Sequence, residues 1–239
     1  MCRLIRSAFF VVAVLAMPLR GYAKDLSVDN GYLGASVTFS SSGGNLTVTL
    51  TNNFTGDPVK SKDVLTGVFF DIEPSAGDLI TGTAKICATC SVTNGGLTGP
   101  GGSVGGEWAY QFGSEGLLFG DHYGISSTSL GIFDKSDLFG GANLNGAAGP
   151  DGVDYGITTK SDTPGNNDST LAGIPLVLNQ VIFTFSGLPA GFDPSTAISN
   201  INFNYGPKPS NVPEPTSLAL LGIGGATAWI ARRRRKVTV

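Results

Sequence analysis

Positive charge is scarce in most of this sequence. Residues 24–212 contain no arginine, and their seven lysines face 17 aspartate and glutamate residues, which gives a net charge of −10. The whole-chain charge of −3 hides this imbalance, because every arginine lies in the first 20 or the last eight residues. An acidic surface without arginine repels phosphate backbones, so nucleic-acid binding is excluded.

The C-terminal end combines a proline motif, an apolar run and a basic cluster. Pro213, Glu214 and Pro215 precede an uncharged run at residues 216–231. As a helix, these 16 residues would rise about 24 Å against a hydrocarbon core of about 30 Å, so they predict a short transmembrane span. The positive-inside rule holds the basic cluster in the cytoplasm and places everything before Pro213 outside. The cluster consists of Arg232, Arg233, Arg234, Arg235 and Lys236.

This order of elements resembles the PEP-CTERM sorting signal of Gram-negative bacteria. The resemblance implies that an exosortase, an integral membrane protease or transpeptidase, recognises Pro213, Glu214 and Pro215. It also implies transient anchoring in the inner membrane, cleavage near the motif, and final residence at the cell surface or in an extracellular matrix. A plain single-pass anchor that is never processed is the alternative.

The N-terminal end predicts export. Arg3 and Arg6 precede an apolar segment at residues 8–17, and residues 21–23 read Gly-Tyr-Ala, which suits a signal peptidase acting after the Sec machinery. Arg20 lies unusually close to that site, so an uncleaved anchor is the alternative. The predicted parts are a signal peptide at 1–23, an ectodomain at 24–211 and a sorting signal at 212–239.

The ectodomain alternates apolar and polar residues and has no helical periodicity, which predicts a single all-β domain. Residues 35–39 and 46–50 flank a Gly-Gly turn and are typical of a hairpin. Many short strands with Gly-rich turns predict a jelly-roll-like β-sandwich, with a closed barrel as the alternative. Further strands are expected at 64–72, 79–86, 108–112, 116–119, 177–185 and 198–205, and residues 181–185 are expected to form a central, heavily buried strand. Long loops are expected at 93–106 and 138–167.

Three short segments, at residues 105–110, 123–127 and 149–157, resemble exosortase-dependent surface proteins whose shared domain has no established enzymatic activity. The resemblance implies no catalytic residues. It agrees with the ending of the chain and adds no chemistry.

Cys87 and Cys90 are the two cysteines of the ectodomain, three positions apart. Outside the cytoplasm such a pair favours a disulfide, which closes a small loop and contributes about 2 kcal/mol. Redox catalysis would need a βαβ context that the sequence lacks, and a zinc site would need two further ligands where the chain has one histidine.

Candidates for hydrolytic chemistry are few. His122 follows Asp121, and the simplest interpretation is a loop histidine held by that aspartate. The Gly-x-Ser-x-Gly spacing occurs at residues 101–105, but it lies in an expected Gly-rich loop and not in the strand-to-helix turn of a nucleophile elbow. Glu107 and Glu115 could form the carboxylate pair of a glycosidase, but such pairs are common in an acidic chain.

Calcium is a candidate ligand, and the prediction includes no other cofactor. Asp134 and Asp137 flank a turn, and Asp151 and Asp154 lie in the long loop, all as the hard oxygen donors that calcium prefers. Their spacing is not that of an EF-hand. Ordinary Asx-turns are the alternative.

Four aromatic residues in or beside Gly-rich segments are candidates for contact with a glycan: Trp108, Tyr110, Tyr123 and Tyr155. Trp108 is favoured as a core residue instead. Three hypotheses follow: a noncatalytic surface or matrix protein acting by adhesion or coating, a carbohydrate-binding module that calcium assists, and a secreted hydrolase. We favour the first, with extracellular polysaccharide as a candidate partner.

Overall fold

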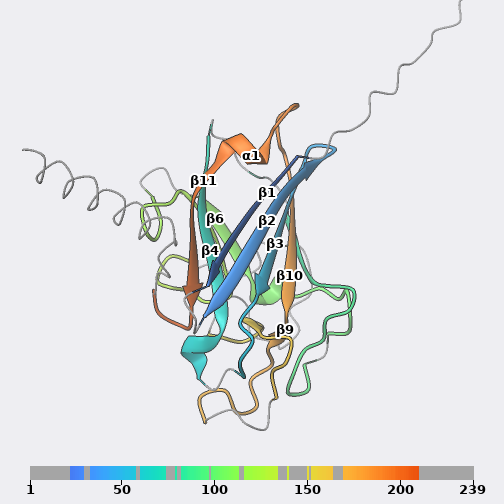
Figure 1. Ribbon diagram of the computed structural model, residues 1–239, viewed down its shortest axis with the longest axis vertical. Coiled ribbons are helices and arrows are strands. Elements are labelled where there is room, and N and C mark those ends of the chain that lie inside the picture. The colour runs from blue at the N-terminus through green and yellow to red at the C-terminus, as the bar shows by residue number, and fades with distance from the viewer. Residues whose placement is uncertain are drawn as a thin grey trace, which may run out of the picture.

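The computed structural model of the chain has strands in two sheets and almost no helix, so the all-β prediction is confirmed (Figure 1). The first sheet is wholly antiparallel, with strands in the order β1–β2–β3–β10–β5. Its strands are β1 (Tyr22–Asp29), β2 (Gly34–Ser42), β3 (Asn45–Asn52), β5 (Gly82–Ile86) and β10 (Gln180–Ser186). The structure describes residues 22–29, 33–57, 60–73, 79, 82–96, 98–112, 116–133, 139, 150, 152–163 and 169–209.

The second sheet is built around β4, which pairs with β7, β8 and β11. Strand β6 pairs with β7 at one side, and β8 and β9 pair in parallel. Its strands are β4 (Leu65–Ile72), β6 (Ala109–Phe112), β7 (Tyr123–Ser126), β8 (Ile157–Thr158), β9 (Val177–Leu178) and β11 (Ile198–Tyr205). The helical turns are η1 (Ser61–Asp63), η2 (Gly105–Glu107) and α1 (Pro194–Ala197).

Aromatic side chains join the two sheets. Phe39 of β2 meets Phe70 of β4 with ring centroids 4.9 Å apart, and Trp108 meets Phe183 of β10 at 5.0 Å. Strands β2 and β10 alternate between more and less buried residues, because one face of each turns toward this core. Strand β4 is buried on both faces, since a second cluster around Phe69 covers its other side.

Most of the expected strands are present. The hairpin of β2 and β3 turns at Gly43 and Gly44, both with positive φ (59° and 78°), as a two-residue turn of type I′ requires. The strands expected at 64–72, 79–86, 108–112 and 198–205 correspond to β4, β5, β6 and β11. Residues 181–185 were expected in a central strand, and they lie in β10, between β3 and β5 of the first sheet. The most buried strand, however, is β4.

Two predicted strands are wrong in part or in whole. Residues 116–119 form a turn, because Gly116 and Phe119 have positive φ (82° and 60°) and their apolar neighbours pack onto the cluster around Phe69. The strand expected at 177–185 is divided at Asn179, whose φ is +76°. Strand β9 therefore belongs to the second sheet and β10 to the first.

Strands β1, β7 and β8 lie where no strand is expected from the sequence. Strand β8 lies within the long loop predicted at 138–167, only part of which is among the described residues. Strand β1 begins at Tyr22 and pairs with β2 along its whole length. The predicted signal-peptidase site after Ala23 thus falls between the second and third residues of β1, while residues 1–21 lie outside the described part of the chain.

The described chain starts and finishes at opposite ends of the body (Figure 1). Near its start, the Lys24 ammonium donates to the backbone oxygen of Ile198, beside α1. At the other end β11 stops at Tyr205, and Gly206 turns beneath η1 with its N–H donating to Val64 O at 2.8 Å. The Gly206 oxygen accepts from the Thr66 hydroxyl at 2.8 Å, which fixes the point where the chain leaves the body.

Replacing Gly206 with alanine should destabilise the fold where the chain leaves the body. Gly206 has φ +73°, and an added Cβ would lie 2.9 Å from the Lys62 Cα, so strain and a backbone clash add together. We expect Gly206→Ala to lower the free energy of unfolding by about 3 kcal/mol, measured by chemical denaturation.

Gly43→Ala is the matched control, because φ there is +59° but nothing lies within 4 Å of the added Cβ. That change should cost about 1 kcal/mol. Equal losses in the two variants would mean that η1 does not hold Gly206 rigidly.

Candidate functional site

The aromatic residues proposed to contact a glycan do not form an exposed platform. Trp108 and Tyr155 are fully buried, and the indole N–H of Trp108 donates to Tyr155 O at 3.1 Å. Tyr123 is 6% exposed and stacks on Phe70. Tyr110 is half-buried, and its hydroxyl donates to a backbone oxygen at 2.7 Å. Trp108 lies in the core, as the sequence favours, and the other three rings are buried or half-buried, so the four rings do not present an exposed face to a glycan.

The calcium prediction rests mainly on residues that the structure does not describe. Asp134, Asp137 and Asp151 lie outside the described residues, and Asp154 is half-buried next to Tyr155. Within the described ranges no group of three or more His, Cys, Asp or Glu side chains is placed to hold a metal ion. Calcium binding stays a prediction.

Cys87 and Cys90 form the disulfide that their spacing predicts, with Cα atoms 5.0 Å apart. The bond closes a turn after β5, in which Cys90 N donates to Cys87 O at 3.1 Å. The N–H of Gly101 donates to the same oxygen at 3.1 Å, so the turn also fastens the segment that follows it. The disulfide is therefore a local structural link.

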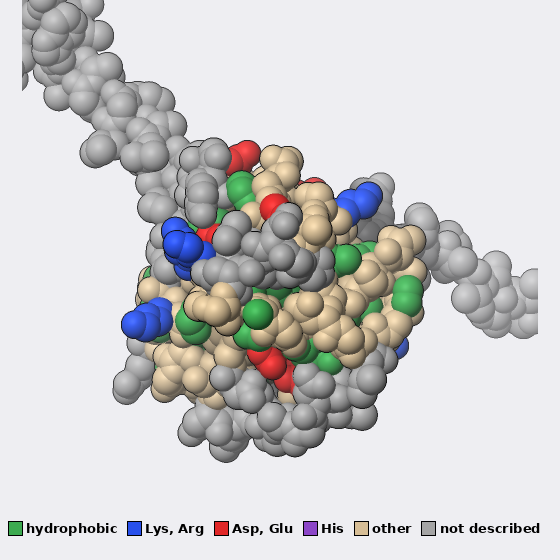
Figure 2. Space-filling view, turned by 90° about the horizontal axis from the view of Figure 1, so that it is seen from below, with side chains coloured by type: hydrophobic (Ala, Val, Ile, Leu, Met, Phe, Trp, Pro, Cys, Tyr) green, Lys and Arg blue, Asp and Glu red, His purple; other side chains and the backbone are tan. Residues whose placement is uncertain are grey.

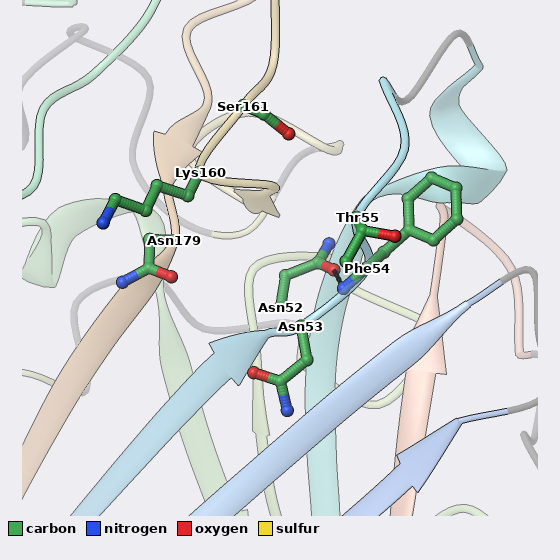
Figure 3. A pocket seen from close by; sticks show the side chains of 7 residues that line it. All are labelled: Asn52, Asn53, Phe54, Thr55, Lys160, Ser161 and Asn179. Atoms are coloured by element: carbon green, nitrogen blue, oxygen red, sulfur yellow. Dashed lines mark hydrogen bonds between the residues drawn. The ribbon is translucent and has the colours of Figure 1, made fainter.

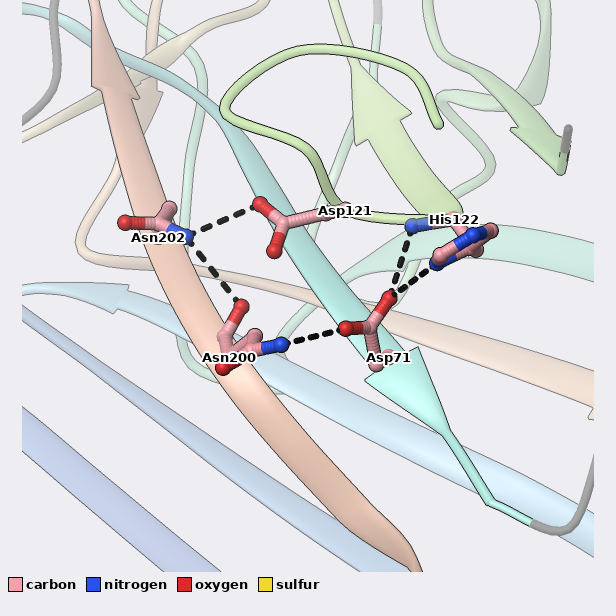
Figure 4. Close-up of polar contacts among 5 residues, drawn as sticks. All are labelled: Asp71, Asp121, His122, Asn200 and Asn202. Carbon is pink, nitrogen blue, oxygen red and sulfur yellow. Dashed lines mark hydrogen bonds and ion pairs between the residues drawn. The ribbon is translucent and has the colours of Figure 1, made fainter. Parts of the chain in front are cut away.

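His122 is held by Asp71 and not by Asp121, which corrects the sequence-based interpretation (Figure 4). Asp71 Oδ1 lies 2.8 Å from both the His122 backbone nitrogen and its Nδ1. Asn200 donates to the other carboxylate oxygen of Asp71. Burial raises the pKa of Asp71, but the hydrogen bonds from His122 and Asn200 outweigh burial and bring the pKa below its ordinary value.

Asp121 belongs to the same polar network but meets a different partner. It is 1% exposed, and its carboxylate accepts from Asn202 Nδ2 at 2.9 Å. Asn202 also donates to Asn200 O at 3.2 Å (Figure 4). The network thus ties the start of β7 to β4 and to β11, where Asn200 has positive φ (50°) and interrupts the pairing.

The described residues do not bring together either of the side-chain groups that hydrolysis was expected to use. Across the described residues His122 hydrogen-bonds only to Asp71, so no serine is placed beside the imidazole as a nucleophile would be. Glu107 is buried in η2 at 2% exposure, and Glu115 lies outside the described ranges. The Asp71–His122 network acts as a brace between strands.

A groove that the sequence does not reveal lies at the end of the body where the chain leaves. Its volume is about 580 Å³, and Figure 3 shows Lys160 and Asn179 on one side and Asn52, Asn53 and Thr55 on the other. Phe54 and Ser161 complete the lining. The lining residues come from the end of β3, the loop after β8 and the junction of β9 and β10, so only the folded chain brings them together.

Asn52 fixes one wall of this groove. Its side chain is 2% exposed; Nδ2 donates to Ile157 O at 2.9 Å, and Oδ1 accepts from Phe54 N at 3.1 Å. Its backbone N–H donates to Asn179 O at 3.0 Å, across to the other wall. The amide therefore sets the conformation of the segment after β3 and connects the two sheets.

Two aspartates brace the loops behind the groove. Asp57 Oδ1 accepts from Thr163 N at 3.0 Å, and Asp162 Oδ2 accepts from the Thr158 hydroxyl at 2.8 Å. Burial raises the pKa of Asp162 to about 6, with the Thr158 hydrogen bond opposing the rise and the neighbouring Asp57 carboxylate adding to it. Ionised Asp162 therefore destabilises the fold at neutral pH.

Asp162→Asn should make the protein more stable at neutral pH. Because the folded-state pKa is raised to about 6, wild-type stability is fully present below the unfolded pKa near 4 and falls as pH rises through 6. The melting temperature of the variant should thus exceed that of wild type at pH 8, and the difference should shrink toward pH 4.

Thr158→Val supplies the second arm of this test. Removing the hydroxyl takes away the hydrogen bond that favours the carboxylate, so the pKa of Asp162, followed by carboxyl carbon NMR shifts, should rise further above about 6. An Asp162 that titrates near 4 in both proteins would contradict the proposed brace.

The comparison with known proteins concerns the end of the chain. No curated protein and no solved structure matches this chain. Residues 211–236 match the family model of the PEP-CTERM protein-sorting motif, a stretch that includes Pro213, Glu214, Pro215 and the basic cluster. The motif lies outside the described residues, among which no helix is long and apolar enough to cross a bilayer. The chain thus carries a PEP-CTERM sorting motif, which implies export and a membrane-anchored sorting signal.

Proposed function

We propose that this chain is an exported, exosortase-processed protein of the cell surface or extracellular matrix, without catalytic activity, whose ectodomain acts in adhesion or in the biofilm matrix. The observation that carries the proposal is the sorting motif at residues 211–236, which starts two positions after the last described residue. Folded body and sorting signal are therefore separated by a very short linker.

The architecture proposed for the body is a β-sandwich. The aromatic contacts between β2 and β4 and between Trp108 and β10 support it, because they bury one face of each sheet against the other. The jelly-roll form of the sandwich stays a prediction. A body of this kind presents loops and edges to its surroundings while its core remains closed.

Processing follows from the chemistry of the tail. Pro213 and Pro215 disfavour helix around Glu214, which favours an extended motif that a protease can reach. From Gly206 to Pro213 the chain has seven steps, which reach at most about 25 Å. With Gly206 held under η1, the short linker keeps the motif close to both the body and the outer surface of the inner membrane.

A noncatalytic role is supported by what the polar side chains do. The side chains of Asp71, Asp57 and Asp162 accept hydrogen bonds that join strands and loops to one another. The acidic, arginine-free surface favours solubility outside the cell. Signal peptidase, the Sec machinery and an exosortase are the proposed processing partners.

Replacing Pro213, Glu214 and Pro215 with alanines should block processing. Full-length protein should then accumulate in the inner membrane of an exosortase-bearing host, while the wild-type surface fraction contains a product that ends near residues 212–215. Intact mass spectrometry of both fractions measures this directly.

The matched control is Pro207→Ala with Pro209→Ala, which changes prolines of the same linker outside the motif. This variant should be processed like wild type. Release of a shortened product from the triple-alanine variant would refute exosortase recognition, and a wild-type protein found only at full length would identify a plain anchor.

A further inference from the structure

The groove at the exit end of the body contains side chains whose hydrogen-bonding capacity is unused. Within the described part of the chain, the side chains of Asn53, Thr55, Lys160 and Asn179 make no hydrogen bond. They carry amide, hydroxyl and ammonium groups, so both donors and acceptors line the groove, and Figure 3 shows them on both of its sides. The Asp71–His122 network differs in this respect, because its members bond to one another.

The walls of this groove are held in place before any ligand arrives. Asn179 has φ +76°, and its backbone N–H and O bond to Thr158 O and Asn52 N, both at 3.0 Å. On the loop side, the Thr159 hydroxyl donates to Gly56 O at 3.0 Å. A non-glycine residue held at positive φ costs energy and concentrates at binding sites, and a rigid site loses less entropy when it binds.

The chemistry of the lining favours a neutral, hydroxyl-rich ligand. Asparagine amides can donate to one sugar hydroxyl and accept from the next, and the half-buried Phe54 adds some apolar surface. The net charge of −10 and the nearby Asp57 and Asp162 would repel a polyanion, and the single positive charge of Lys160 does not offset this repulsion. Seen from below in Figure 2, most of the described surface is uncharged, with hydrophobic patches and scattered Lys, Asp and Glu groups.

We propose that the groove between residues 52–55 and 160–161 binds a chain of neutral sugars in extracellular polysaccharide, with Asn53, Asn179 and Lys160 hydrogen-bonding to sugar hydroxyls. A volume of about 580 Å³ is within the range of small-molecule sites, so a short stretch of the chain fits. The proposal names a ligand class for the proposed matrix function and rests on the placement of the ectodomain outside the cell.

The test titrates full-length protein with cellohexaose, maltoheptaose and laminarihexaose by calorimetry, with oligogalacturonate as the charged comparison. A detergent without sugar in its headgroup keeps the groove free. At least one neutral oligosaccharide should bind more tightly than the uronate, and its affinity should be nearly independent of salt, because no ion pair is formed.

The variant Asn53→Ala with Asn179→Gly removes two of the proposed contacts, and glycine accepts the positive φ at position 179. We expect its affinity to fall about tenfold, and Lys160→Gln to have a smaller effect. Asn45→Ala with Lys85→Gln is the control, because these exposed residues lie outside the groove lining.

Absence of binding to every neutral oligosaccharide, tighter binding of the uronate, or equal affinity in the groove variant and wild type would each overturn the proposal. Sorting is read separately, from the mass of the product in the surface fraction. Failure of the groove therefore leaves sorting untouched, and failure of sorting is visible whether or not sugars bind.

Discussion

The positive φ of Asn179 is the constraint on which the connection between the two sheets depends. The chain completes β9 in the second sheet, turns at this residue, and enters the first sheet as β10. The turn is satisfied on both sides, since the Asn179 N–H donates to Thr158 O and its carbonyl accepts from Asn52 N. Without this turn β10 could not run between β3 and β5 and still follow β9 directly. The aromatic core between Phe183 and Trp108 then depends on where β10 lies.

The same turn explains why a groove exists at this end of the molecule. It sets Asn179 and the loop after β8 on one side of the groove and the end of β3 on the other. Asn52 and the two aspartates behind the loops then hold the separation between the walls. One consequence is a half-buried carboxyl group at Asp162 with a pKa of about 6. A fold selected for stability alone would favour asparagine there, since the amide keeps the Thr158 hydrogen bond without a partly buried charge.

The sequence predicted the elements whose signals lie in consecutive residues. The β2–β3 hairpin was accessible because its alternation and its Gly-Gly turn are both written in consecutive residues. The turn at residues 116–119 was mistaken for a strand, since its apolar side chains cover β4 from outside and periodicity does not distinguish that cover from a strand. The break at Asn179 had one weak indication in the sequence. In an unbroken strand, Asn179 would face the same side as the buried Val177 and Val181 and would point its amide into the core.

The groove and the pairing of His122 were beyond sequence reasoning for a different reason. His122 lies beside Asp121 in the chain, but neighbouring side chains diverge, and its partner Asp71 comes from another strand. The groove likewise unites residues from three separate segments. The four aromatic residues were candidates for a binding surface because composition does not distinguish a core ring from an exposed one. In the structure three of the rings are buried and Tyr110 is half-buried.

Placement of the groove and the exit at one end connects the two proposals. Tyr205 pairs with Leu65, Leu65 with Ile157, and Ile157 accepts from Asn52, so a short row of contacts leads from the end of β11 to the groove. While the tail is in the membrane, a linker of at most about 25 Å keeps this end toward the bilayer. A long polysaccharide would then compete with the membrane for the same face. Cleavage at the motif removes that competition, so in this scheme sorting also makes the groove accessible.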